Sequence, residues 1–153
     1  MNGSEGSATL VRVMYVDSLR INLPYFESVE AGFPSPADDY FEEEINLENE
    51  LIRHPEATMF LRVRGNSMTG AGIFKDSVLI VDRSLPPKNG DTVIVAIDGE
   101  FTVKWYHKPK GKEEIHLLPG NPAFKSIIVR EGSHSMFLLW GVVTHVIHKP
   151  LRP

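Results

Sequence analysis

Residues 91–107, DTVIVAIDGEFTVKWYH, contain two runs of β-branched and aromatic residues separated by Asp98-Gly99. Runs of this composition are typical of strands, and Asp-Gly between two apolar runs is a strong signal for a hairpin turn. Because side chains alternate along a strand, Phe101 and Trp105 share one face of the second run, and Lys104 lies on the opposite face. The stretch therefore predicts an antiparallel hairpin with a lysine inside its second strand.

Strand-like runs of the same kind continue on both sides of this hairpin. They are short and bounded by Gly, Pro, Asn or Asp, and they read TMFLRVRG (58–65), SVLIVDR (77–83), EIHLLPG (114–120), SIIVREG (126–132) and MFLLWGVVTHVIH (136–148). No helical periodicity longer than about two turns occurs among them. Residues 57–153 are therefore predicted to form a compact, mostly β domain.

The preceding segment, residues 32–56, has a different character. Two early prolines favour an extended backbone, and seven acidic residues precede the first basic one, Arg53. One short helix fits this segment, because Asn46 can cap it and Leu47 and Leu51 then share a face. We predict an acidic linker with a short helix rather than a part of the core.

The composition excludes several classes of protein. The absence of cysteine excludes disulfides, thiolate metal sites and a cysteine nucleophile. The six histidines match no metal-binding motif, so we expect neither a metal nor another cofactor. A net charge of −4 disfavours a dedicated DNA-binding surface. No apolar run reaches the roughly 18 residues that span a bilayer, and the N-terminus does not resemble a secretion signal, so we expect a cytoplasmic protein without a membrane anchor.

Two residues are candidates for chemistry, and each has a plainer alternative. Ser67, in GNSM (65–68), follows a predicted strand, where a serine commonly caps a turn. Such a turn can also present a hydroxyl together with backbone N–H groups that stabilise an oxyanion. Lys104 is either a solvated charge or, if its face of the strand is covered, an amine whose pKa burial lowers until it can act as a base. A Ser-His-Asp triad stays open as well, because its members meet only in space.

Several motifs occur together and in order: GNSM (65–68), DSVLIVDRS (76–84), NGDTVIVAIDGEFTVK (89–104), LLPGNPAF (117–124) and WGVV (140–143). Over about residues 29–148 the chain resembles the LexA/UmuD family of self-cleaving Ser-Lys proteases. The resemblance implies a LexA/signal-peptidase-like β domain with an extended N-terminal arm. It also implies that Ser67 is the nucleophile, that Lys104 is the general base, and that the N–H groups of Asn66 and Ser67 form the oxyanion hole.

The family cuts its own arm at an Ala-Gly bond, and Ala31-Gly32 in AGFPSPA (31–37) supplies one. The small Ala31 suits a tight pocket, and Gly32 allows the backbone to approach the serine closely. The resemblance thus implies three parts: an arm, residues 1–31, that cleavage removes; the acidic linker, 32–56; and a catalytic and dimerisation domain, 57–153.

Only 31 residues precede Gly32, and they show no helix-turn-helix pattern, so the chain is most similar to UmuD-like proteins. That similarity implies a serine endopeptidase of the SOS response, stimulated by a RecA–single-stranded DNA filament. The processed homodimer would join a UmuC-like Y-family polymerase in translesion synthesis, without sequence-specific DNA binding of its own. The long apolar run 136–148 is interpreted as an exposed edge strand that pairs with a second copy, or else as a strand within its own core.

Three other functions remain open at this point. One is a non-catalytic regulatory module that binds an error-prone polymerase. The others are a phage-type self-cleaving repressor and a signal-peptidase-like enzyme, which the absent DNA-binding domain and membrane anchor disfavour.

Overall fold

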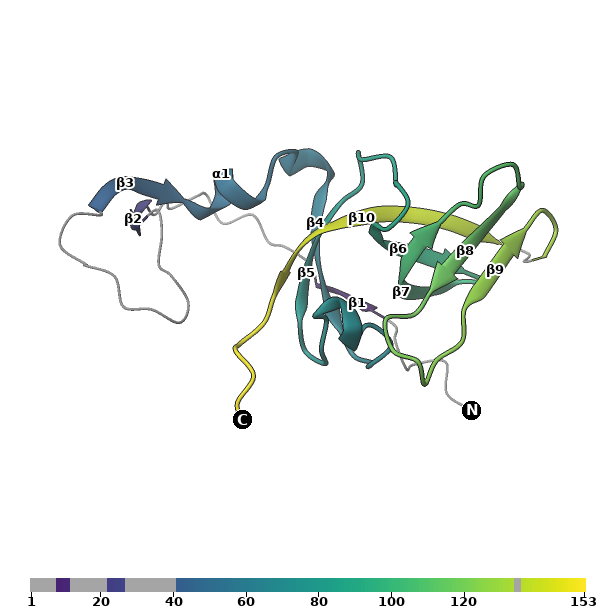
Figure 1. Ribbon diagram of the computed structural model, residues 1–153. Coiled ribbons are helices and arrows are strands. Elements are labelled where there is room, and N and C mark those ends of the chain that lie inside the picture. Colours follow the sequence, from purple (N-terminus) through teal and green to yellow (C-terminus); the bar gives the residue numbers. More distant parts are fainter. Residues whose placement is uncertain (1–7, 12–21, 27–40, 134–135) are drawn as a thin grey trace. The chain divides into compact units, whose positions relative to one another are not determined.

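The computed structural model describes residues 8–11, 22–26, 41–133 and 136–153 (Figure 1). The chain divides into two units, one made of residues 1–13 and 54–153 and the other of residues 14–53. Ala31 and Gly32, the predicted cleavage site, lie outside the described residues. Within the described part, no helix has the length and apolar character needed to cross a bilayer.

The larger unit is built on one antiparallel sheet of eight strands (Figure 1). The strands are β1 (Ala8–Val11), β4 (Thr58–Val63), β5 (Val78–Asp82), β6 (Thr92–Ile97), β7 (Glu100–His107), β8 (Glu114–Leu118), β9 (Ile127–Arg130) and β10 (Phe137–Ile147). Their order across the sheet is β1-β4-β5-β10-β6-β7-β8-β9. Two short 3-10 helices, η1 (Pro55–Ala57) and η2 (Thr69–Ala71), flank β4. The predicted fold class, mostly β, is confirmed.

The hairpin predicted from residues 91–107 is formed by β6 and β7. Ile97 pairs with Glu100, so Asp98 and Gly99 alone make the turn. Their φ angles are 49° and 85°, both in the left-handed region that two-residue hairpin turns require. The turn residues thereby set the register that places Lys104 opposite Val93.

Apolar clusters lie on both faces of this hairpin. Ile94 and Val103 belong to one cluster, which also contains Leu61, Val63, Met68, Ile73, Leu79 and Val81. Val93 and Val95 point to the other face and belong to a second cluster, with Leu117, Val129 and Val142. Because both faces are covered, a polar side chain in the middle of β7 is removed from water whichever way it points.

β10 lies in the interior of the sheet and is hydrogen-bonded on both sides. Its first half pairs with β6 and its second half with β5, and Val142 is paired with both neighbours. A Cβ atom at Gly141 would lie 2.5 Å from Val81 Cγ1, so only glycine permits this close packing. Each half of β10 is thus paired along one edge only: β10 is an inner strand of the sheet, and the interpretation that residues 136–148 pair with a second copy stays a prediction.

The smaller unit contains a two-stranded antiparallel sheet of β2 (Asn22–Phe26) and β3 (Phe41–Asn46), followed by α1 (Leu47–Leu51). The short predicted helix is present, and the Asn46 side chain caps it by accepting a hydrogen bond of 2.9 Å from Asn49 N. β3 was not predicted, because its sequence, FEEEIN, is rich in glutamate, which is depleted in strands. The division at residues 31 and 56 stays a prediction.

Candidate active site

Ser67 lies in a tight turn between β4 and η2. Its side chain is 1 % exposed, and the following Met68 is fully buried in the core cluster. The Met68 carbonyl accepts hydrogen bonds from the N–H groups of Ala71, at 3.0 Å, and Ile73, at 3.2 Å. The core thus anchors the residue next to Ser67, which gives the hydroxyl a defined position at the end of the strand.

Lys104 reaches Ser67 from the middle of β7. Its Nζ atom lies 2.9 Å from Ser67 Oγ, and the lysine side chain is also buried, with 5 % exposed. As an ammonium group the lysine donates to Oγ, whereas the neutral amine can accept the proton of the hydroxyl. The structure therefore brings together the two residues that were singled out in the sequence, and it excludes the solvated alternative for Lys104.

Burial changes the acidity of this lysine. Removal from water disfavours the charged amine and lowers the pKa of Lys104 from 10.5 to about 8. At pH 7 about one molecule in ten then holds the neutral amine, compared with fewer than about one in a thousand for a solvated lysine. A neutral amine in contact with a buried hydroxyl can remove its proton.

A loop between β8 and β9 braces the serine turn. Asn121 Nδ2 donates to the Asn66 carbonyl at 2.9 Å, and Gly70 N donates to the Gly120 carbonyl at 2.7 Å. Gly120 N also lies 3.2 Å from Met68 Sδ. Three contacts therefore hold residues on both sides of Ser67. Asn121 was not singled out in the sequence, although it lies in LLPGNPAF, because the residues it joins are far apart in the chain.

The predicted oxyanion hole consists of the N–H groups of Asn66 and Ser67, which belong to this braced turn. The contact of Asn121 with the Asn66 carbonyl restrains the peptide group that joins the two residues. That the N–H groups of Asn66 and Ser67 bind the oxygen of a scissile carbonyl stays a prediction, as does cleavage at Ala31-Gly32.

Two histidines have carboxylate partners: His116 Nε2 lies 2.8 Å from Glu114 Oε1 on β8, and a second pair lies at the end of β5. His54 Nδ1 lies 2.6 Å from Asp82 Oδ2, and Asp82 is buried. Burial alone would raise the pKa of Asp82, but hydrogen bonds from Ser84 and His54 outweigh it and lower the pKa. Ser84 Oγ donates to the carboxylate at 2.6 Å rather than facing the imidazole. A triad requires contact between hydroxyl and imidazole, so this cluster caps the end of β5 instead.

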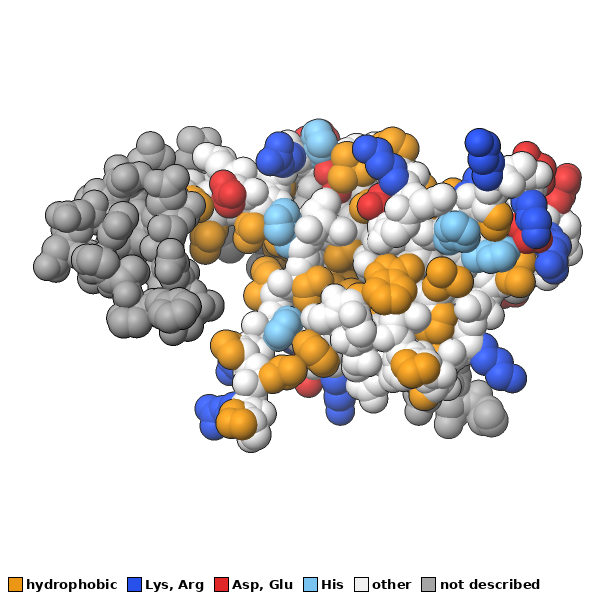
Figure 2. Space-filling model, viewed as in Figure 1, with side chains coloured by type: hydrophobic (Ala, Val, Ile, Leu, Met, Phe, Trp, Pro, Cys, Tyr) orange, Lys and Arg blue, Asp and Glu red, His pale blue; other side chains and the backbone are white. Residues whose placement is uncertain are grey.

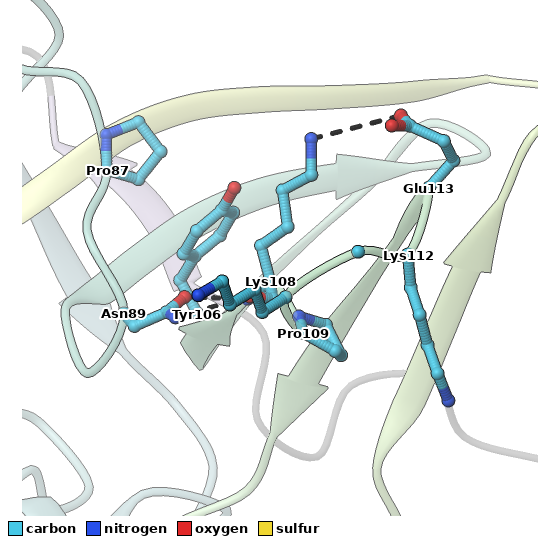
Figure 3. A pocket seen from close by; sticks show the side chains of 9 residues that line it. Pro87, Asn89, Tyr106, Lys108, Pro109, Lys112 and Glu113 are labelled. Atoms are coloured by element: carbon cyan, nitrogen blue, oxygen red, sulfur yellow. Dashed lines mark hydrogen bonds and ion pairs between the residues drawn. The ribbon is translucent and has the colours of Figure 1, made fainter.

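A pocket of about 550 Å³ lies beside the β7–β8 turn and contains none of the predicted site residues (Figure 3). Three lysines line it, but they do not converge: Lys108 extends toward Glu113, 3.9 Å away, and Lys112 points to the other side. Figure 2 has the same view as Figure 1, and at its right-hand end basic and acidic side chains lie next to one another. The positive charge is therefore dispersed, and the pocket lacks the focused field of an anion site.

Comparison with known proteins places the chain in a family of peptidases. Residues 24–144 match the family described as Peptidase S24-like. Protein SamA of Salmonella typhimurium is 44 % identical over 125 residues, which cover 82 % of this chain and 84 % of SamA. Protein MucA of Escherichia coli is 42 % identical over 79 % of this chain and 80 % of MucA. LexA repressor 1 of Geobacter sulfurreducens is 33 % identical over 99 % of this chain and 70 % of the repressor.

Proposed function

The chain belongs to the Peptidase S24-like family, and we propose that it is a self-cleaving serine endopeptidase in which Ser67 is the nucleophile and Lys104 the general base. The resemblance to the LexA/UmuD family that the motifs indicated is confirmed by the family and the relatives. The observation that carries the catalytic assignment is the buried contact of 2.9 Å between Lys104 Nζ and Ser67 Oγ. A purely regulatory binding module has no need to bury a lysine against a serine.

In the proposed reaction, neutral Lys104 accepts the proton of Ser67 as Oγ attacks the carbonyl carbon of Ala31. Negative charge develops on the carbonyl oxygen, where the N–H groups of Asn66 and Ser67 stabilise it. The bond to Gly32 breaks as protonated Lys104 gives its proton to the leaving amine. Water then hydrolyses the ester on Ser67, with Lys104 again accepting a proton, and the free serine is restored.

The family and the UmuD-like relatives support a role in SOS mutagenesis. Within that role we propose that a RecA–single-stranded DNA filament stimulates removal of residues 1–31. The acidic linker, 32–56, then stays attached to the catalytic domain, 57–153. The processed protein acts as a homodimer and as an accessory subunit of a UmuC-like Y-family polymerase.

The pH dependence of self-cleavage tests the base directly. Because only the neutral amine can accept the proton, the rate without any partner should rise with pH and reach half its plateau near pH 8, the pKa of Lys104. A solvated lysine would place that midpoint near 10.5. The measurement is the loss of intact protein on gels between pH 6 and pH 11, with mass spectrometry of the two fragments.

Fragments that meet at Ala31 and Gly32 would support both the site and its register. An intact chain at every pH, under conditions in which a LexA control cuts itself, would refute the proposed activity. Cutting at another bond would refute the assignment of Ala31-Gly32 alone.

A further inference from the structure

The carbonyl of Asn66 and the N–H of Ser67 belong to one peptide group. In a planar trans peptide these two bonds point in opposite directions, so a contact that fixes the oxygen also fixes the direction of the N–H. Asn121 Nδ2 makes that contact, at 2.9 Å from the Asn66 oxygen. The orientation of the Ser67 N–H is therefore linked to a side chain 55 residues away from Asn66.

The side-chain amide of Asn121 is itself held in one orientation. Its Oδ1 atom accepts a hydrogen bond of 3.0 Å from Ala123 N, which can only donate. Its Nδ2 atom faces the Asn66 carbonyl, which can only accept. Exchanging the two ends of the amide would break both bonds, so Asn121 presents a donor to the serine turn at all times.

The loop that carries Asn121 is fixed against the same turn by its neighbour. Gly120 accepts from Gly70 N at 2.7 Å and approaches Met68 Sδ through its own N–H at 3.2 Å. Loop and turn therefore move as one body, and the Asn121 amide cannot drift away from Asn66.

We propose that Asn121 is a positioning residue for the oxyanion hole. It directs the Ser67 N–H toward the place where the scissile carbonyl oxygen gains charge. Its hydrogen bond to the Asn66 carbonyl also polarises the peptide group and makes the N–H a stronger donor. This inference rests on the proposed function, because it assigns to Asn121 a part in stabilising the transition state of self-cleavage.

Two substitutions separate positioning from simple support of the loop. Asn121→Asp keeps an acceptor for Ala123 N but places a carboxylate, which cannot donate, against the Asn66 oxygen. Asn121→Ala removes both bonds and adds no charge. If Asn121 positions the peptide, the plateau rate above the pH midpoint falls about 10- to 100-fold in Asn121→Asp, and at least as far as in Asn121→Ala. If it only caps its own loop, Asn121→Asp behaves like the wild type and Asn121→Ala is the damaged variant.

Asn89 provides a matched control in the pocket of Figure 3. Its side-chain amide also clamps the backbone of another residue, accepting from Lys108 N at 2.7 Å and donating to Lys108 O at 3.2 Å. Asn89→Asp removes the same type of donor in a pocket whose lining includes neither Ser67 nor Lys104. It should leave the plateau rate unchanged, and thermal unfolding should show that all three variants are folded at the assay temperature.

The pH profile of Asn121→Ala gives a second readout. Because Asn121→Ala introduces no charge, the pKa of Lys104 should not change, so the midpoint stays with that of the wild type while the plateau falls. A wild-type plateau in Asn121→Asp, or a slower reaction in Asn121→Ala than in Asn121→Asp, would overturn the proposal while leaving the proposed protease intact. An uncut wild type would instead refute the protease.

Discussion

Ser67→Ala is expected to abolish self-cleavage at every pH, with a loss of at least about 10⁴-fold, because it removes the hydroxyl that contacts Lys104 Nζ. Lys104→Met should be equally inactive, since the hydroxyl then has no base. Both losses are measured as intact protein remaining at pH 10 while the wild type is cut. A variant of either residue that is cut at a measurable fraction of the wild-type rate would contradict the assigned roles.

The same two substitutions should affect stability in opposite directions. Ser67→Ala leaves the buried Lys104 amine without its partner, which costs about 1–3 kcal/mol. Lys104→Met removes an amine that loses its hydration when the protein folds. Lowering the pKa from 10.5 to about 8 corresponds to a penalty of about 3 kcal/mol for the charged form. An inactive variant that is more stable than its parent is the expected sign of a buried catalytic amine.

The cleanest measurement compares Ser67→Ala with the double variant Ser67→Ala/Lys104→Met, because neither cuts itself. Between about pH 8 and 10.5 the unfolded chain binds a proton at Lys104 that the folded chain has released, so the stability of Ser67→Ala rises with pH in this window. Urea unfolding should therefore find the double variant more stable at pH 7, by up to about 3 kcal/mol, and the difference should shrink toward pH 10. Equal stabilities at pH 7 would mean that the lysine is not desolvated.

Gly70→Ala should damage both stability and cleavage. A Cβ atom at Gly70 would lie 2.2 Å from the Gly120 carbonyl oxygen, so the two backbones must separate and their hydrogen bond of 2.7 Å must break. We expect a loss of about 2–3 kcal/mol in the free energy of unfolding. The rate of self-cleavage should fall at least about 10-fold, because the displaced segment carries Ser67.

Gly72→Ala is the matched control in the same turn. Gly72 has a φ of 74°, and nothing lies within 4 Å of its would-be Cβ atom. The substitution therefore adds backbone strain of about 1 kcal/mol without a collision. Cleavage close to the wild-type rate in Gly72→Ala but not in Gly70→Ala would support a role for the contact between Gly70 and Gly120 in holding the serine turn. Equal effects of the two substitutions would argue against that role.

Much of the domain could be predicted from local sequence. The β6–β7 hairpin follows from Asp98-Gly99 between two apolar runs, and α1 follows from the capping Asn46. What could not be predicted is which strands pair. β10 lies between β5 and β6 because of contacts across much of the chain, and its composition suited an edge strand equally well.

In the candidate site, too, local sequence predicts some features, whereas others depend on contacts between distant segments. Alternation along the strand predicts the face on which Lys104 lies, but only the cover on both faces of the hairpin decides that it is buried. Its meeting with Ser67 was expected from the family resemblance, not from composition. The bonds of Asn121 to Asn66 and of His54 to Asp82 join segments that are distant in the chain, and nothing in their local sequence indicates them.

The central place of β10 also decides when the sheet can be completed during synthesis. On the ribosome, β4 and β7, with their serine and lysine, emerge long before residues 137–147. Until those residues emerge, β5 and β6 have no strand between them, and the hydrogen-bonded order of the sheet is interrupted there. The sheet that carries Ser67 and Lys104 is therefore complete only when the polypeptide is nearly finished.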